Sequence, residues 1–182
     1  QLGVFLHELR LFKSTKEIEI LRKAAEISVQ SHLHVMQELS PGQMEYEIEA
    51  DLQYHFARRG ARFTAYPSIV GGGSNACVYH YIENDQPLVA GDLVLIDAGS
   101  EYEYYASDVT RTLPVDGVFT KPQADLYQIV LDAQEAAIEQ IQPGNHWNQP
   151  HEAAVRVITQ GLIKLGLLDG DVETLVNTGA YK

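Results

Sequence analysis

The spacing of apolar residues changes twice along this chain, from a helical period to a strand period and back. Apolar residues recur at helical spacing from Ser14 to Leu39 and again from about Met44 to Arg59. Between Phe63 and Val115 the pattern is typical of strands separated by Gly, Asn and Asp turns. Helical spacing then returns over about 120–165. The strands are therefore expected in one central block, with helices before and after it.

Local signals mark where these helices begin and end. Glu17 lies three residues after Ser14, and Gln123 three residues after Thr120, the spacing of reciprocal caps at a helix start. Helix-ending residues follow each of the four helical segments. They are Pro41-Gly42, Gly60, Pro143-Gly144 and Gly166.

The order helix, Pro-Gly, helix, Gly occurs twice, with an offset of 143 − 41 = 102 residues. The first occurrence is followed by the strand block, whereas only 182 − 166 = 16 residues follow the second. If this is a repeat, a second set of strands is expected after Lys182. Coincidence is the alternative, because Pro-Gly after a helix is common. An unfinished repeat should expose apolar surface, which predicts poor solubility or association, including a homo-oligomer.

Charge and composition argue against several partners. The chain has 13 basic and 25 acidic residues, a net charge of −12, which disfavours nucleic acid or an anionic membrane as the main partner. No apolar run approaches the roughly 18 residues that cross a bilayer. Cys77 is the only cysteine, so a disulfide within the chain is excluded and a cytoplasmic location fits. Residues 1–12 lack the features of a signal peptide and are interpreted as a linker from a missing N-terminal domain.

Two aspartates, Asp97 and Asp108, carry the strongest chemical signal. If their strands pair as a hairpin centred between Tyr102 and Glu103, the two residues lie directly opposite each other, with Cβ atoms about 4.5–5.5 Å apart. Their face also carries apolar residues such as Leu95, so it is expected to be dry. Opposed carboxylates in a dry setting call for a bound cation or a shared proton. A divalent metal is the preferred interpretation; an acid–base pair, or two aspartates with no joint role, are the alternatives.

Other polar residues are assigned by position to packing, turns or solvent. His80 falls in an expected strand, 77–82, where a histidine is more often a packing residue than a catalyst. The run Gly71-Gly72-Gly73 lacks the ending of a phosphate loop and is interpreted as a hairpin turn. A solvated helix face is expected to carry Glu45, Glu47 and Glu49.

Three ordered motifs resemble those of a known family. They are IVGGGSNACVYHY at 69–81, DAG at 97–99 and SDVTRT at 107–112. Together they are similar to the catalytic domain of bacterial Xaa-Pro aminopeptidases (aminopeptidase P), which are pita-bread metallopeptidases. The resemblance covers about Leu11 to Lys182. It implies an α+β pita-bread (creatinase/aminopeptidase-like) fold, an antiparallel sheet with helices on one side, in which 13–182 form the front, C-terminally incomplete part of the domain.

The resemblance also implies a site and a reaction. In this family two metal ions, often manganese, are held by two Asp, one His and two Glu; the two Asp match Asp97 and Asp108. His80 matches the histidine that donates a hydrogen bond, in its neutral form, to the tetrahedral intermediate. Tyr81 favours the proline-peptidase branch over methionine aminopeptidases, and Tyr66 would support the metal ligands. The implied substrate is a peptide with proline in second position, which loses its first residue.

The remaining metal ligands of the family, one His and two Glu, are expected after Lys182. The chain alone is therefore expected to be inactive, because a two-metal centre needs more protein ligands than two carboxylates. Two alternatives stay open: a prolidase, which cuts dipeptides only, and a pita-bread protein that has lost its metals and binds peptides. The presence of Asp97, Asp108 and His80 argues against the second.

Overall fold

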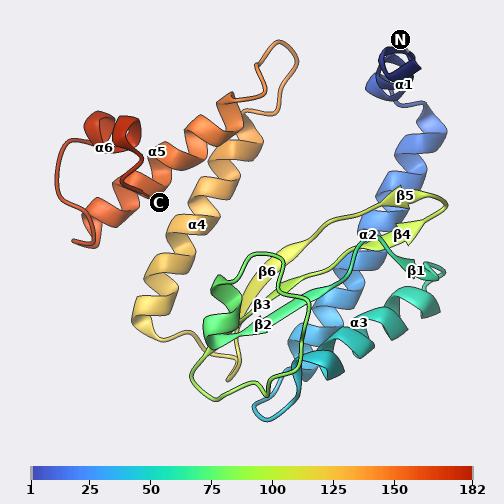
Figure 1. The fold of residues 1–182 in the computed structure, drawn as a ribbon, viewed down its shortest axis with the longest axis horizontal. Coiled ribbons are helices and arrows are strands. Elements are labelled where there is room, and N and C mark those ends of the chain that lie inside the picture. The colour runs from blue at the N-terminus through green and yellow to red at the C-terminus, as the bar shows by residue number, and fades with distance from the viewer. Residues whose placement is uncertain (1, 182) are drawn as a thin grey trace. The chain divides into compact units, whose positions relative to one another are not determined.

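The computed structural model describes residues 2–181, so Gln1 and Lys182, the outer ends of the expected segments 1–12 and 13–182, lie outside it. The chain divides into two compact units, Gln1–Val118 and Phe119–Lys182. Within the described residues the first unit contains helices α1–α3 and strands β1–β6, and the second contains α4–α6 (Figure 1). None of the helices over 2–181 is long and apolar enough to cross a membrane.

The first two expected helices are confirmed as α2, Thr15–Glu38, and α3, Glu45–Arg58. The Ser14 cap is present: the Glu17 amide donates to Ser14 Oγ at 3.2 Å, and the Ser14 amide donates to Glu17 Oε2 at 2.6 Å. Residues Leu2–Leu11, within the expected linker, form a further helix, α1, that buries none of its residues. Whether 1–12 link two domains stays a prediction.

Acidification is expected to loosen the start of α2. The Glu17 carboxylate accepts hydrogen bonds from the Ser14 amide and from the Tyr105 hydroxyl (2.7 Å), and these lower its pKa from 4.5 to about 2. Because the folded-state pKa lies below the unfolded value, this stabilisation is present above pH 4.5 and is lost as the pH falls towards 2. Amide exchange at the start of α2 should therefore speed up, after correction for intrinsic rates, between about pH 6 and about pH 3. A Glu17→Gln variant should lose this pH dependence; the same response in both proteins would contradict the assignment.

The second unit confirms the other two expected helices. The Thr120 amide donates to Gln123 Oε1 at 2.8 Å ahead of α4, Lys121–Glu139, and α5 spans Gln149–Lys164. The two helices pack against each other, and Gly161 permits a close approach, since a Cβ there would lie 2.6 Å from Ile129. A short helix with no sequence expectation, α6, follows at Val172–Thr178 and packs against α5.

The strands of the first unit form two three-stranded antiparallel sheets, in the orders β1-β4-β5 and β2-β3-β6. The sheets are joined because β3 runs on into β4 and β5 into β6; the Ser107 amide donates to the Ser100 carbonyl at 3.0 Å and the Ala98 amide to the Val109 carbonyl at 3.1 Å. The strands are Phe63–Thr64 (β1), Ile69–Gly72 (β2), Leu93–Asp97 (β3), Ser100–Tyr102 (β4), Tyr105–Ala106 (β5) and Thr110–Pro114 (β6).

Helices α2 and α3 pack side by side against these strands, which gives the expected antiparallel sheet with helices on one side (Figure 1). Helix α2 contacts β4 and β5, and α3 contacts β1 and β2. The core lies between the two layers and is built from apolar side chains of both. Its members include Ile27, Val35, Ile48, Leu52, Phe56, Val70, Val94 and Ile96.

The expected strand at 77–82 is wrong. Gly73–Cys77 form a 3₁₀ helix, η1, and no strand follows until β3. The Gly71–Gly73 turn is also wrong, because Gly71 and Gly72 are strand residues that pair with Leu95 and Val94. The glycine at 71 has a steric reason: a Cβ there would lie 2.9 Å from the backbone of Asn75 and Ala76, so β2 passes directly against η1.

The expected register of the Asp97 hairpin is wrong by two residues. Tyr102 pairs with Tyr105, so the turn is centred between Glu103 and Tyr104, and Asp97 pairs with Thr110 rather than with Asp108. Glu103 and Tyr104 both adopt the left-handed conformation, with φ of 48° and 69°. Because this conformation usually falls to Gly or Asn, the residue types at the turn did not reveal its position.

Candidate metal centre

Asp97 and Asp108 converge although they are not directly opposite. Asp97 is the last residue of β3, and Asp108 lies two residues before its partner Thr110, which places both on the same face of the ribbon. The Tyr66 hydroxyl lies 2.6 Å from Asp97 Oδ1 and 3.0 Å from Asp108 Oδ1. The expectation of a dry face is wrong, because Asp97 is half-buried and Asp108 is exposed.

Tyr66 marks the point where the two carboxylates meet. Burial, and then the hydrogen bonds to Asp97 and Asp108, raise the pKa of the phenol far above its usual value, so the hydroxyl keeps its proton. A phenol has one proton and can donate to only one of the two carboxylates at a time. Within residues 2–181 no other donor reaches either carboxylate. One oxygen of each carboxylate lies against the same hydroxyl, and both carboxylates have lone pairs that no donor uses. Such oxygens are suitable ligands for a hard divalent cation.

A buried hydroxyl cluster attaches the ribbon to α2 close to both aspartates. Ser28 Oγ on α2 lies 2.7 Å from Ser107 Oγ and 3.1 Å from Ser100 Oγ, and it accepts from the Ser100 amide at 2.9 Å. Ser107 directly precedes Asp108, so the cluster fixes the backbone that carries this carboxylate. The role of these serines was not predicted from the sequence, although Ser28 is a polar residue on the apolar stripe of α2 beside Ile27.

His32 supports Asp97 in a similar way. Its Nε2 lies 3.0 Å from the carbonyl oxygen of Ala98, so this nitrogen carries the proton and donates. Burial is the main cause that lowers the pKa of His32 below its usual value, which favours the neutral ring. His32 lies one helical turn after Ser28, on the same face of α2. The two side chains therefore hold consecutive parts of one ribbon.

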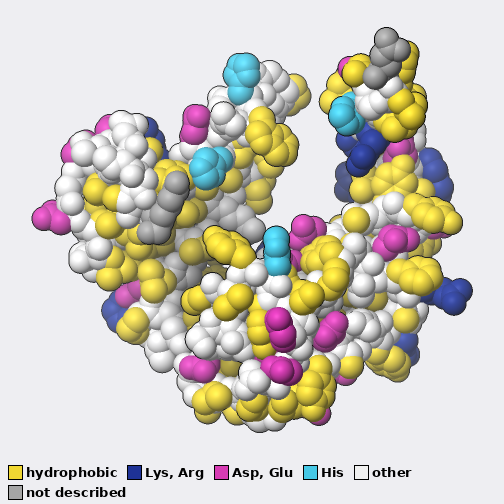
Figure 2. Space-filling model, viewed as in Figure 1, with side chains coloured by type: hydrophobic (Ala, Val, Ile, Leu, Met, Phe, Trp, Pro, Cys, Tyr) yellow, Lys and Arg dark blue, Asp and Glu magenta, His cyan; other side chains and the backbone are white. Residues whose placement is uncertain are grey.

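His80 lies on the same pocket as Asp97. The pocket has a volume of about 370 Å³ and is lined by both residues, by Thr110 and by apolar residues of β2, β3 and the segment after η1. His80 is exposed and left-handed (φ 55°), so its expected packing role in a strand is wrong. Histidine, acidic and hydrophobic side chains gather on this face of the first unit (Figure 2).

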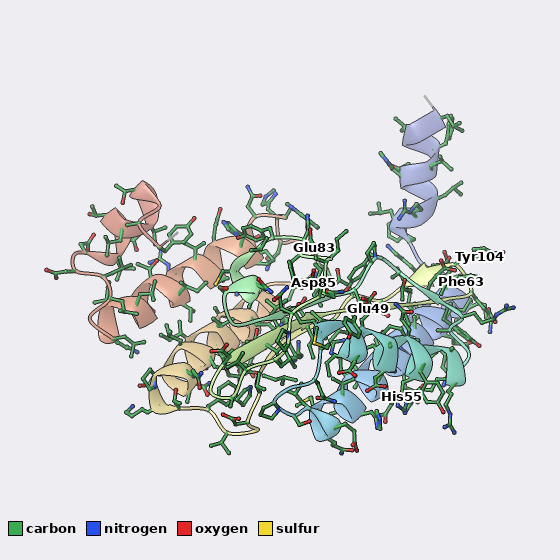
Figure 3. All side chains as sticks on the ribbon, turned by 60° about the horizontal axis from the view of Figure 1, so that its bottom comes forward. Glu49, His55, Phe63, Glu83, Asp85 and Tyr104 are labelled. Carbon is green, nitrogen blue, oxygen red and sulfur yellow. The ribbon has the colours of Figure 1, made fainter. Side chains whose placement is uncertain are left out.

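The acidic residues at the start of α3 are not all solvated, which corrects the sequence interpretation. Glu47 is exposed as expected, but Glu45 is fully buried and accepts four hydrogen bonds. Glu49 accepts from Asn84 Nδ2 at 2.8 Å. Figure 3 shows Glu49 on α3, with Glu83 and Asp85, the neighbours of Asn84, on the segment that passes over it.

The structure therefore brings together two of the metal ligands implied by the resemblance. Over residues 2–181 no group of three or more His, Cys, Asp or Glu side chains is placed to hold a metal ion. The site contributed by this part of the chain consists of the two carboxylates, the phenol between them, and His80 on the adjoining pocket.

Comparisons with known proteins find relatives that match nearly the whole chain. The Xaa-Pro aminopeptidase of Haemophilus influenzae is 51% identical over 177 residues, which cover 97% of this chain and 41% of that protein. The Xaa-Pro aminopeptidase of Escherichia coli is 45% identical over 177 residues, covering 97% and 40%. This chain therefore spans about two fifths of the length of these relatives.

Solved structures show the same fold. Pseudomonas aeruginosa aminopeptidase PepP superposes with a TM-score of 0.97 at 51% identity, covering 100% of this chain and 41% of that one. Zinc-substituted Escherichia coli aminopeptidase P in complex with product gives a TM-score of 0.94 at 45% identity, covering 97% and 40%. These matches confirm the expected α+β fold of the aminopeptidases P. The model of metallopeptidase family M24 matches residues 19–179, and the chain belongs to this family.

Proposed function

We propose that these residues are part of a two-metal Xaa-Pro aminopeptidase, which removes the N-terminal residue from peptides with proline in second position. The observation that carries the proposal is the convergence of Asp97 and Asp108 on the Tyr66 hydroxyl, in a chain of metallopeptidase family M24. The two relatives described above are both named Xaa-Pro aminopeptidase, which favours this specificity over prolidase.

The two aspartates would hold divalent cations, manganese by the family resemblance. When bound, such a pair of ions lowers the pKa of a water and polarises the scissile carbonyl. The role of the chain is to hold the two carboxylates at one place: Tyr66 spans them, the serine cluster fixes the backbone before Asp108, and His32 fixes the carbonyl after Asp97.

His80 would act on the substrate rather than on the metal. From the rim of the pocket its imidazole N–H can donate to the negative charge that develops on the carbonyl oxygen of the scissile bond. Val78 and Tyr79, which also line the pocket, are exposed by 54% and 96% and offer apolar surface to a peptide. The pocket therefore has a hydrogen-bond donor, His80, and an apolar surface, Val78 and Tyr79, beside Asp97.

Two further proposals concern the cellular location of the protein and its association with further copies. A cytoplasmic location is supported by the single cysteine, Cys77, which is free and exposed. Association with further copies is supported by the apolar side chains that α1 exposes, among them Phe5 and Leu9. Cell fractionation and light scattering, respectively, test them.

Manganese titration of the 182-residue chain tests the metal assignment. Two carboxylates supply only part of a ligand set, so we expect weak binding, which Mn²⁺ reveals by broadening NMR signals of nearby residues. Signals around Asp97, Asp108 and Tyr66 should broaden first. Asp97→Asn removes one charged ligand and should raise the Mn²⁺ concentration needed by about tenfold or more.

The matched control is Asp132→Asn, the same change at an exposed aspartate of α4, which should leave the broadening near Tyr66 as it is. Broadening spread evenly over acidic side chains, unaffected by Asp97→Asn, would overturn the metal site. The substrate class is tested in a protein of the relatives' length that contains these residues. Hydrolysis of a Xaa-Pro dipeptide but not of a Xaa-Pro-Xaa tripeptide would make it a prolidase.

A further inference from the structure

Glu45 is a fully buried carboxylate outside the metal site. It is the first residue of α3, and its side chain has no exposed surface. A buried charged group is costly unless it is fully hydrogen-bonded. Here four donors surround it: the Gly72 amide (2.8 Å) and Asn75 Nδ2 (3.1 Å) at Oε1, and the Tyr81 hydroxyl (2.7 Å) and the Gln86 amide (3.0 Å) at Oε2.

All four donors belong to the segment that carries His80. Gly72 and Asn75 precede His80 in the sequence, whereas Tyr81 and Gln86 follow it. The Tyr81 hydroxyl also accepts from Asn75 Nδ2 at 3.0 Å, which closes a ring of bonds across the base of the segment. Glu45 therefore binds the residues on both sides of His80 within the segment 72–86 and holds them against the start of α3.

The backbone position of His80 is set by these hydrogen bonds to Glu45. Within residues 2–181 its imidazole makes no hydrogen bond, and its backbone adopts a left-handed conformation that a non-glycine residue keeps only when its surroundings impose it. The bonds nearest to it in the sequence are those of Tyr81, which joins the adjacent residue to Glu45. The bond from Asn84 Nδ2 to Glu49 holds the part of the same segment that follows His80 to α3.

We infer that Glu45 is a positioning residue that holds His80 at the pocket shared with Asp97, acting through the segment 72–86. The inference rests on the proposed function for the role of His80 in hydrolysis, but the geometry it concerns exists without metal or peptide. In this arrangement α3 orients His80 through Glu45, and α2 orients the aspartates through Ser28 and His32.

A glutamine cannot replace Glu45. The two oxygens of Glu45 each accept from a backbone amide, Gly72 at one and Gln86 at the other. A glutamine has one oxygen and one NH₂ group, so in either orientation one of these amides faces a donor instead of an acceptor. Glu45→Gln is therefore expected to break the bond to either the Gly72 or the Gln86 amide and to free that end of the segment, although the side chain keeps its shape.

The test uses NMR on the 182-residue chain, following amide exchange over 72–86 and the imidazole carbon-bound proton signals of the histidines. In Glu45→Gln we expect exchange in this segment to rise by about tenfold or more, and the His80 signal to move. The His32 signal should stay in place, because His32 reports the packing of α2 on the ribbon. Glu47→Gln is the matched control: Glu47 lies in the same first turn, is exposed and accepts only from the Met44 amide, so His80 should not respond.

An unchanged His80 signal in Glu45→Gln would overturn the inference. If that variant loses the signals of a folded protein, Tyr81→Phe decides, because it removes a single donor and leaves the other three bonds of Glu45 in place. A shifted His80 signal in Tyr81→Phe supports the positioning role, and an unchanged one overturns it. Neither measurement uses metal or peptide, so failure of the manganese titration would remove the proposed function and leave this result to stand.

Discussion

Replacing Gly99 by alanine is expected to cost at least about 3 kcal/mol of folding free energy, the upper range for overpacking a well-packed site. A Cβ at position 99 would lie 1.8 Å from the carbonyl oxygen of Ser107 and 3.1 Å from Tyr66 Cε1. The first of these atoms is backbone, and it cannot retreat without disturbing the serine cluster and Asp108. Denaturant unfolding of both proteins measures the loss.

The control for this prediction is Gly3→Ala in α1. Among residues 2–181, no heavy atom outside the adjoining backbone of α1 lies within 4 Å of a Cβ at Gly3. Because alanine is also the better helix former, the unfolding midpoint should stay the same or rise. Equal midpoints for the Gly99 variant and the unsubstituted chain would show that the ribbon can move at position 99 without loss of stability. The Gly99 variant should also lose the selective Mn²⁺ broadening around Tyr66, because Tyr66 and Asp108 are both displaced.

Replacing His80 by alanine is expected to lower kcat for a Xaa-Pro-Xaa tripeptide by about 10²–10³, the effect of removing one donor to developing negative charge. The measurement requires a protein of the relatives' length that contains these residues. Because the interaction forms mainly in the transition state, kcat and kcat/KM should fall together while KM changes little. Steady-state kinetics at several tripeptide concentrations separate these quantities.

His80→Gln keeps an N–H donor at the same position and should recover part of the lost rate. His7→Ala, at an exposed histidine of α1, provides a control for histidine removal outside the pocket and should leave kcat unchanged. A kcat within about twofold of the original for His80→Ala would rule out this donor role, whatever the metal titration shows.

The helices were predictable because their signals are local. Ser14 with Glu17 and Thr120 with Gln123 identify helix starts within a few residues, and the Gly positions after each helix identify the ends. The backbone confirms this reading for α3 and α5: Gly60 and Gly166, which directly follow the C-cap residues Arg59 and Leu165, have φ of 101° and 71°. No tertiary contact is needed to recognise such a pattern.

The segment around His80 was not predictable in the same way. Its aromatic and β-branched residues favour a strand, but its backbone and side chains bond instead to Glu45 on a distant helix. Nothing local distinguishes buried Glu45 from exposed Glu47, two residues away. The structure of the segment depends on hydrogen bonds to the start of α3 from Gly72, 27 residues away in the sequence, and from Gln86, 41 residues away.

At the candidate metal site, the two carboxylates were predictable from the sequence, but the register of their strands was not. Alternation placed Asp97 and Asp108 on one face, which is confirmed, whereas the left-handed turn at Glu103 and Tyr104 moved their pairing by two residues. Tyr66 could be named only through the family resemblance. Its hydroxyl lies against Asp97, 31 residues away in the sequence, and against Asp108, 42 residues away. No local sequence pattern indicates contacts at such separations.

The short separation of the two aspartates has a consequence for the order of assembly during synthesis. They are 108 − 97 = 11 residues apart, and the side chains that hold them, from Ser28 to Ser107, all precede Asp108 in the sequence. Closing so short a loop costs little chain entropy, and N-terminal parts of a chain fold first as it leaves the ribosome. Besides the residues before Asp108, the carboxylate pair needs only β6, because Asp97 pairs with Thr110 and the Ala98 amide donates to the Val109 carbonyl. Ligands contributed from elsewhere would then dock onto a finished half-site instead of building it.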